Sequence, residues 1–219
     1  TLDAFDHLLA FKADQKADEL SVATRGRAIA HDAMRNLVSM FETTGPKIFG
    51  LFANKEGTAA FVHELFGEDS RKVTTGEGAT LAKQAAKAWA DTTEAMRQSF
   101  NAAGGDIGKL EDWHLPQHHA QKLVAKAGRE KWVAAILPKL KRERYVNTDG
   151  TLMNDEQMAT MLQNAWVTIA TGGANKHEPG AAKGYGMLAN ANAAERSLHF
   201  KNAKSYLEYQ AQFGNFDMY

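Results

Sequence analysis

Apolar residues recur at steps of three and four along most of the chain, which is the pattern of helices that bury one face. The first example places Leu2, Phe5, Leu8 and Leu9 on one face and predicts a helix over residues 2–20. The same pattern predicts further helices over 24–41, 58–66 and 79–102, with a short apolar stretch over 48–52 between the first two. Gly104-Gly105 is a typical end for the last of these.

Glycine and proline divide the second half into shorter pieces. Pro116 suits the first turn of a helix, which we expect to end near Gly128. Residues 130–145 predict a helix interrupted at Pro138, because proline removes a helical hydrogen bond. Asn154, followed by two acids, is a good cap for a helix. The last three expected helices cover residues 155–170, 187–198 and 203–213.

No window shows the strict alternation of β-branched and polar residues that predicts a strand. We therefore expect an all-α protein, an irregular multi-helix bundle of about ten short to medium helices joined by Gly/Pro loops. An N-terminal helical subdomain over 1–110 and a C-terminal one over 111–219 are predicted, with one continuous domain as the alternative. No internal repeat indicates a solenoid.

Composition excludes several kinds of chemistry. The 219 residues include no cysteine, so disulfides, thiolate metal sites, iron–sulfur clusters and cysteine nucleophiles are excluded. The 26 basic and 26 acidic side chains balance, which argues against nucleic-acid binding through the overall charge. No stretch approaches the roughly 20 apolar residues of a membrane span. The acidic start without Met indicates no secretory signal, and we expect a processed product or a part of a longer chain.

Three histidines are close together at positions 114, 118 and 119. His114 and His118 are four residues apart, a spacing that zinc sites use on a helix. Pro116 lies between them, however, and Gln117 does not supply the carboxylate of a zinc protease motif. The favoured interpretation is that these histidines cap the helix or pack under Trp113. A metal-dependent enzyme using His114, His118 and His119 stays as an alternative.

Other candidate chemistry is weaker. The glycine-rich loop over 172–186 has no strand before it and lacks the spacing of a phosphate-binding loop, so we expect a surface loop, with partner binding as the alternative. Glu111 and Asp112 are close to His114 in the sequence, which suggests acid–base chemistry, but no nucleophile with an evident base accompanies them. We predict no catalytic residues, no metal and no cofactor.

Basic residues gather between positions 122 and 144. Eight lysines and arginines stand there against Glu130 and Glu143, a local excess of six. Trp132 and Tyr145 are candidate base-stacking surfaces beside them. The simplest interpretation is a solvated face; contact with nucleic acid or an acidic partner is the alternative, and contact with lipid headgroups a third. The basic residues are Lys122, Lys126, Arg129, Lys131, Lys139, Lys141, Arg142 and Arg144, of which the last four are the candidate contacts.

The chain from Trp113 to Phe213 also carries a set of distinctive motifs. It resembles a helical segment of the very large proteins of tailed bacteriophages and prophages, both internal virion (ejection) proteins and polyvalent proteins that enter the host with the DNA. The resemblance rests on Trp113-x-Leu115-Pro116-Gln117-x-His119, Ala127-Gly128-Arg129-Glu130-Lys131-Trp132, Tyr145-x4-Gly150, Trp166-x-Thr168-Ile169-x-Thr171-Gly172-Gly173, Glu195-Arg196-Ser197-Leu198-His199-Phe200-Lys201, Tyr206, Tyr209 and Phe213-Gly214. Asn101-Ala102-Ala103-Gly104-Gly105, before this region, is also similar.

The resemblance implies a structural and interaction module involved in genome delivery into the host. It implies a place in the virion interior, with delivery to the host envelope or cytoplasm. Sister copies or other virion proteins are the implied partners, with DNA contact through residues 122–144. The alternative is a DNA-associated module of a polyvalent protein that acts after entry.

Overall fold

The computed structural model describes residues 22–44, 47–109, 114–115, 117–174 and 198–214 of the chain. These residues form α-helices and short 3-10 turns, with three isolated β-bridges and no sheet, which confirms the all-α prediction. The eight described α-helices are α2 (Val22–Thr44), α3 (Lys47–Phe52), α4 (Lys55–Leu65), α5 (Glu77–Ala102), α6 (Gln121–Ala127), α7 (Arg129–Ile136), α8 (Asp155–Ala170) and α10 (Ala203–Phe213).

About ten helices were expected, and eight are described. The expected helices over 2–20 and 187–198 lie outside the described residues, as does most of the glycine loop over 172–186. Gly172 and Gly173 are described and end the turn that follows α8, both with positive φ. In the described part of the chain, none of the helices combines the length and the apolar character that crossing a membrane requires.

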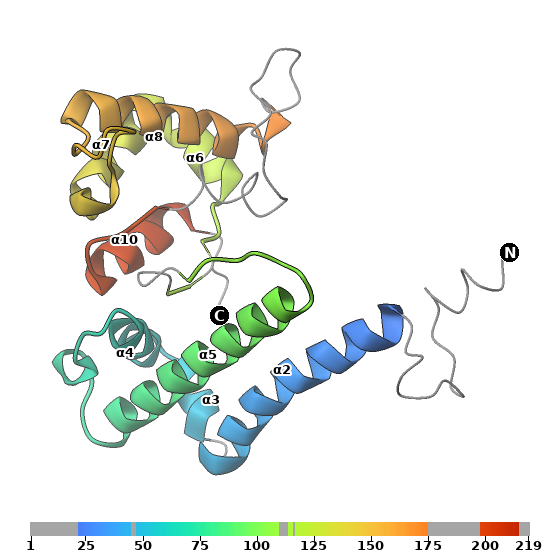
Figure 1. Ribbon diagram of the computed structural model, residues 1–219. Coiled ribbons are helices and arrows are strands. Elements are labelled where there is room, and N and C mark those ends of the chain that lie inside the picture. Colours follow the sequence, from blue (N-terminus) through green and yellow to red (C-terminus); the bar gives the residue numbers. More distant parts are fainter. Residues whose placement is uncertain (1–21, 45–46, 110–113, 116, 175–197, 215–219) are drawn as a thin grey trace, which may run out of the picture.

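Helices α2 to α5 pack together at one end of the molecule. Figure 1 shows α2 and α5 side by side and running in opposite directions, and α4 and α3 contact α5 as well. Alanine dominates the buried face of α5, because Ala82, Ala85 and Ala86 are all buried there. Such small side chains let α4 approach α5 closely, which explains the alanine-rich sequence of this helix.

Helices α6, α7 and α8 form the opposite end, and α10 lies between the two groups (Figure 1). The core is centred on Trp132 of α7 and Tyr209 of α10, both of which are 0% exposed. The same hydrophobic cluster includes Ile48 of α3 and Phe61 of α4. Residues from both sides of position 110 therefore contribute to it.

Side-chain caps fix the beginnings of the best predicted helices. Asn154 accepts a hydrogen bond from the backbone of Gln157, whose side chain accepts the Asn154 N–H in return, which is a capping box. Asn202 caps α10 by accepting from Ser205 N. The predictions for residues 155–170 and 203–213 are both confirmed.

The predicted helix start at Pro116 is wrong. Residues 117–120 are not helical, and α6 begins only at Gln121. Here the chain pairs with distant segments: His119 bridges Gly214, and Ala120 N donates to Phe213 O at 2.7 Å. Backbone N–H and C=O groups that form hydrogen bonds with distant segments cannot form the hydrogen bonds of a helical turn at the same time.

The expected helix over 130–145 is much shorter than predicted. It ends at Ile136, and two 3-10 turns follow, Leu137–Lys139 and Arg142–Arg144. Pro138 lies in the first turn, as its effect on a helix predicts. Between the turns Leu140 bridges Phe200, so this segment runs alongside the chain that leads into α10.

Candidate functional site

The basic residues between 122 and 144 do not share one helix face. Lys122 and Lys126 lie on α6, and Arg129 and Lys131 begin α7. These four side chains are exposed. The other four lie on and between the 3-10 turns that follow α7. The excess of positive charge is therefore divided among several elements.

Within the described part of the chain, the candidate contact residues Lys139 and Arg142 form ion pairs with neighbouring helices. Lys139 pairs with Glu208 of α10, and Arg142 pairs with Asp155 at the start of α8. Arg142 also donates to Met153 O at 3.2 Å. The hydrogen bond from Lys139 holds the pKa of Glu208 below its usual value. Lys139 and Arg142 thus carry much less unbalanced charge than the sequence indicated.

The predicted base-stacking role of Trp132 and Tyr145 is wrong, because both rings are in the core. Trp132 is 0% exposed and Tyr145 is 7% exposed. The Tyr145 hydroxyl accepts the backbone N–H of His199 at 2.9 Å. Burial raises the pKa of Tyr145 to about 12. A base cannot reach either ring without unfolding of the surrounding helices.

The three neighbouring histidines do not converge on one point. The His114 ring packs against Phe66 with centroids 4.1 Å apart, and its carbonyl accepts the Trp89 indole N–H at 3.1 Å. His119 Nδ1 pairs with the Tyr209 hydroxyl. His118 is exposed. The expected helix face shared by His114 and His118 is absent, since the described residues from 114 to 120 are not helical.

No group of three or more His, Cys, Asp or Glu side chains within the described ranges is placed to hold a metal ion. His114 and His119 pack against Phe66 and Tyr209, whereas Trp113, under which the sequence placed them, lies outside the described residues.

A histidine and a glutamate that the sequence did not single out connect α4 to α10. His63 Nδ1 lies 2.9 Å from Glu68 Oε2, and Glu68 Oε1 accepts the backbone N–H of Ala203 at 2.8 Å. Glu68 and Ala203 are 135 positions apart in the sequence, so no local pattern could have indicated their contact.

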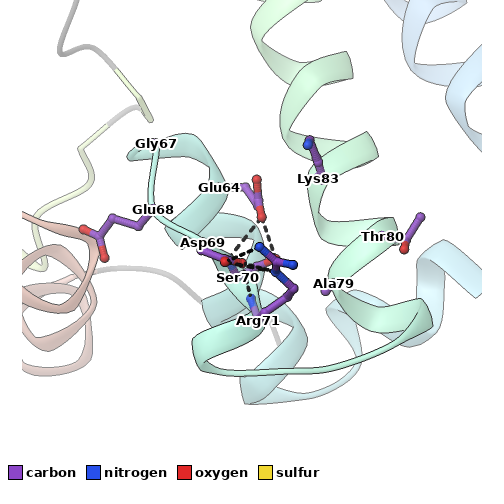
Figure 2. Close-up of a pocket in the computed structure, with 9 residues that line it drawn as sticks. All are labelled: Glu64, Gly67, Glu68, Asp69, Ser70, Arg71, Ala79, Thr80 and Lys83. Atoms are coloured by element: carbon purple, nitrogen blue, oxygen red, sulfur yellow. Dashed lines mark hydrogen bonds and ion pairs between the residues drawn. The ribbon is translucent and has the colours of Figure 1, made fainter.

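A polar pocket of about 500 Å³ opens between the end of α4 and the start of α5 (Figure 2). Glu64 accepts hydrogen bonds from the Ser70 backbone N–H at 3.1 Å and from its hydroxyl at 2.6 Å. Arg71 donates to Asp69 and lowers the pKa of that carboxyl to about 2. Ser70 is only 1% exposed, so its hydroxyl is a structural donor and not an accessible nucleophile.

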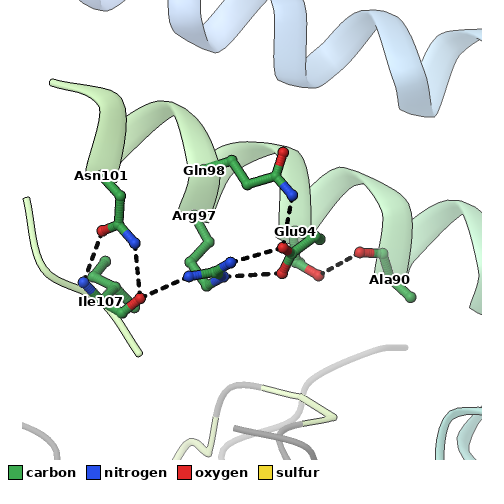
Figure 3. A network of polar contacts seen from close by, with 7 residues as sticks. Ala90, Glu94, Arg97, Gln98, Asn101 and Ile107 are labelled. Atoms are coloured by element: carbon green, nitrogen blue, oxygen red, sulfur yellow. Dashed lines mark hydrogen bonds and ion pairs between the residues drawn. The ribbon is translucent and has the colours of Figure 1, made fainter. Parts of the chain in front are cut away.

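A second polar network folds the chain back after α5 (Figure 3). Arg97 donates to both carboxylate oxygens of Glu94, at 2.9 and 2.8 Å, and to Ile107 O at 2.9 Å. Asn101 exchanges two hydrogen bonds with the Ile107 backbone. Arg97 and Gln98 hold the pKa of Glu94 at about 2. The network fixes the segment beyond α5 and leaves Glu94 charged, which suits a structural ion pair.

Large apolar side chains are exposed mainly on the α2–α5 end of the molecule. On α2, Met34 and Val38 are four residues apart, and Met96 and Phe100 of α5 have the same spacing. Residues four apart share a helix face, so each pair forms a short apolar stripe. Phe49 of α3 is the most exposed of the group at 65%.

Comparison of the chain with models of protein families, with curated proteins and with solved structures gave no match.

Proposed function

We propose that this chain is a non-catalytic, helical interaction module of a phage internal virion (ejection) protein, involved in delivery of the genome into the host. One observation supports a structural role for the motif residues of the resemblance: Trp132, Phe200, Tyr206, Tyr209 and Phe213 are all buried in the core. Phe200, Tyr206, Tyr209 and Phe213 form a chain of ring contacts with centroids 5.1 to 5.7 Å apart. Buried rings of this kind pack the core and specify a fold, which supports a structural role.

The proposed partners are sister copies or other virion proteins in the particle interior. The exposed apolar pairs on α2 and α5 support this, because contact with a partner would remove them from water. Helix α2 packs along α5 and α3 and leaves Met34 and Val38 uncovered.

Mass spectrometry of purified, nuclease-treated virions tests the proposal. We expect peptides of this chain at a fixed number of several copies per particle. Their complete absence from particles would reject the virion role and favour a protein made inside the host cell.

The second candidate is a DNA-associated module of a polyvalent protein that acts after entry. It is supported by Lys122, Lys126 and Lys131, which are exposed and take part in none of the ion pairs found among the described residues. Contacts to several phosphates would make DNA affinity fall steeply with salt concentration.

Charge reversal separates the candidates on the purified chain. Lys122→Glu with Lys126→Glu should weaken DNA binding at low salt by tenfold or more and reduce the salt dependence. Lys141→Glu with Arg142→Glu tests the contact set expected from the sequence. Lys72→Glu with Lys109→Glu, at exposed positions elsewhere, is the charge-matched control. Equal effects of all three pairs, or no binding at low salt, would reject a DNA-binding surface on α6.

A further inference from the structure

Helix α2 carries an apolar stripe on its outer side. Met34 is 56% exposed and Val38 is 43% exposed, and residues four apart lie on the same face of a helix. Helix α2 packs along α5 and α3, and Figure 1 shows it at the edge of this group. The described part of the chain therefore leaves the stripe in contact with solvent.

The opposite side of α2 is polar. Asp32 lies two positions before Met34, which places it on nearly the opposite side of the helix, and it forms an ion pair with Arg35. Charges of this kind are solvated without a partner. The apolar stripe is the part of the exposed surface that gains free energy when it is covered.

The sequence directly before α2 has an apolar face of its own. The residues that form it are Leu2, Phe5, Leu8 and Leu9. They belong to the helix expected over residues 2–20, which lies outside the described residues and ends immediately before Val22, where α2 begins. Helices joined by very few residues pack as antiparallel neighbours. This segment is therefore the nearest apolar surface that the chain can bring to the stripe.

The positions of the apolar residues in the two segments match. Met34 lies twelve positions after Val22, or about 18 Å along the helix axis. Twelve positions back from Leu20, at the same height in an antiparallel pair, is Leu8. The same count places Phe5 within one residue of the height of Val38. Each exposed apolar residue of the stripe thus has an apolar residue of the segment opposite it.

The lower half of the pair is complementary in size. Below Met34 the same side of α2 exposes the small residues Gly26 and Ala30. The positions at their heights in the segment are Lys16 and Lys12, respectively. Long lysine stems lie readily along an apolar surface while the ammonium group stays in water. Small residues leave room for these stems, so the two lysines do not prevent close packing.

We propose that residues 2–20 fold back on α2 as an antiparallel helix and cover Met34 and Val38 with Leu8 and Phe5. The stripe then has two alternative occupants, this segment and a sister copy. A copy reaches the stripe only after the segment leaves it, so the segment limits self-association. This last consequence rests on the proposed function, whereas the cover within one chain does not.

Disulfide cross-linking of the full chain tests the cover, because the sequence has no cysteine to compete. The test variant is Leu8→Cys with Met34→Cys, oxidised at low micromolar concentration and analysed by non-reducing electrophoresis and peptide mapping. We expect a disulfide within one chain, since the two Cα atoms would lie within about 7 Å. It should form at least tenfold faster than in the matched control, Leu8→Cys with Asp32→Cys, which places the second thiol on the polar side of α2.

A further change tests the apolar contact itself. Phe5→Lys, added to the Leu8→Cys with Met34→Cys variant, should slow the cross-link at least tenfold, because it brings a charge to the apolar face. His7→Lys, on the other side of the segment, is the control and should leave the rate within twofold. Thermal melting checks that each variant is folded.

Three results would overturn the proposal. A disulfide that joins two copies would assign the stripe to a sister copy. Equal rates for the two cysteine pairs, or no cross-link at all, would show that the segment does not reach the stripe, as in a helix that continues without a turn from residue 2 into α2. Equal rates for Phe5→Lys and His7→Lys would remove the apolar contact. Copy number in virions is measured separately, so failure of the cover and failure of the virion role are distinguishable.

Discussion

Glu68 Oε1 accepts the backbone N–H of Ala203 at 2.8 Å and so joins the loop after α4 to the first turn of α10. The first N–H groups of a helix have no partner within the helix, so this carboxylate completes the cap that Asn202 begins. Its negative charge also suits the positive end of the helix dipole.

Removal of this carboxylate should loosen the contact between α4 and α10. We expect Glu68→Ala to lower the free energy of unfolding by about 1–3 kcal/mol, because the N–H of the buried Ala203 loses its acceptor. Glu68→Gln keeps an oxygen that can accept and should cost less. Urea unfolding followed by circular dichroism measures both. Glu42→Ala, at an exposed position near the end of α2, is the control, and an equal loss there would contradict the role of Glu68.

The buried tyrosines predict a loss of stability at alkaline pH. Burial raises the pKa of Tyr145 to about 12 and raises those of Tyr206 and Tyr209 as well. Above pH 10 the unfolded chain releases tyrosine protons that the folded chain retains, so stability is complete below pH 10 and falls as pH rises towards 12. Tyr145 alone accounts for about 2–3 kcal/mol. Unfolding measured from pH 9 to 12, with tyrosinate absorbance, should show both changes together.

Two hydroxyl deletions distinguish the roles of these tyrosines. The Tyr206 hydroxyl is buried and has no hydrogen-bond partner among the described residues, whereas that of Tyr145 accepts His199 N. At neutral pH Tyr206→Phe should leave stability unchanged or raise it, and Tyr145→Phe should cost about 1–3 kcal/mol. The opposite order would show that the Tyr206 hydroxyl has a partner that this structure does not show.

Because Trp132 lies in the core, its replacement by a small residue should lower stability strongly. Trp132→Ala should lower the free energy of unfolding by about 3–5 kcal/mol, because the fully buried ring would leave a cavity. Lys131→Ala, next to it and exposed, should change stability by no more than about 0.5 kcal/mol. If Trp132→Ala were as stable as Lys131→Ala in thermal and urea unfolding, the ring could not be in the core.

The apolar stripe on α2 should control self-association. Met34→Lys with Val38→Lys is expected to raise the dissociation constant of any oligomer at least tenfold, since both side chains would bring charge into the contact. Ala28→Lys with Ser39→Lys adds the same charge on another side of α2. Sedimentation equilibrium compares the two double variants. Identical association of both with the unmodified chain would place the contact elsewhere.

Local signals were sufficient for the helices that depend on their own residues. Asn154, two acids and Gln157 form a cap within four positions, and the predicted bounds of α8 agree with the structure. The alanine-rich α5 was likewise predicted to within two residues at its start, and its end at Ala102 agrees. In these segments the free energy that selects the helix comes from neighbours in sequence.

The predictions that were wrong concern residues whose environment is set by distant segments. Gln117 exchanges hydrogen bonds with the Leu198 backbone, so the chain after Pro116 is held extended from 81 residues away. The sequence predicts a base-stacking ring at Trp132 because basic residues gather around it, but the ring itself is buried in the core. The hydrophobic pattern predicts which face of a helix is apolar. It does not predict which of the neighbouring charged residues remain exposed to solvent.

The place of α10 in the core has a consequence for how the chain is made. The chain is synthesised from its N-terminus, so α10 leaves the ribosome after all the other described helices. Nevertheless, Tyr206, Tyr209 and Phe213 of α10 are buried where this helix packs against α4 and α6. Until α10 emerges, the surfaces that it covers face solvent or a chaperone. Closure then requires contacts across more than 130 residues, as between Glu68 and Ala203. Co-translational folding of this chain would therefore finish late, with the arrival of its last described helix.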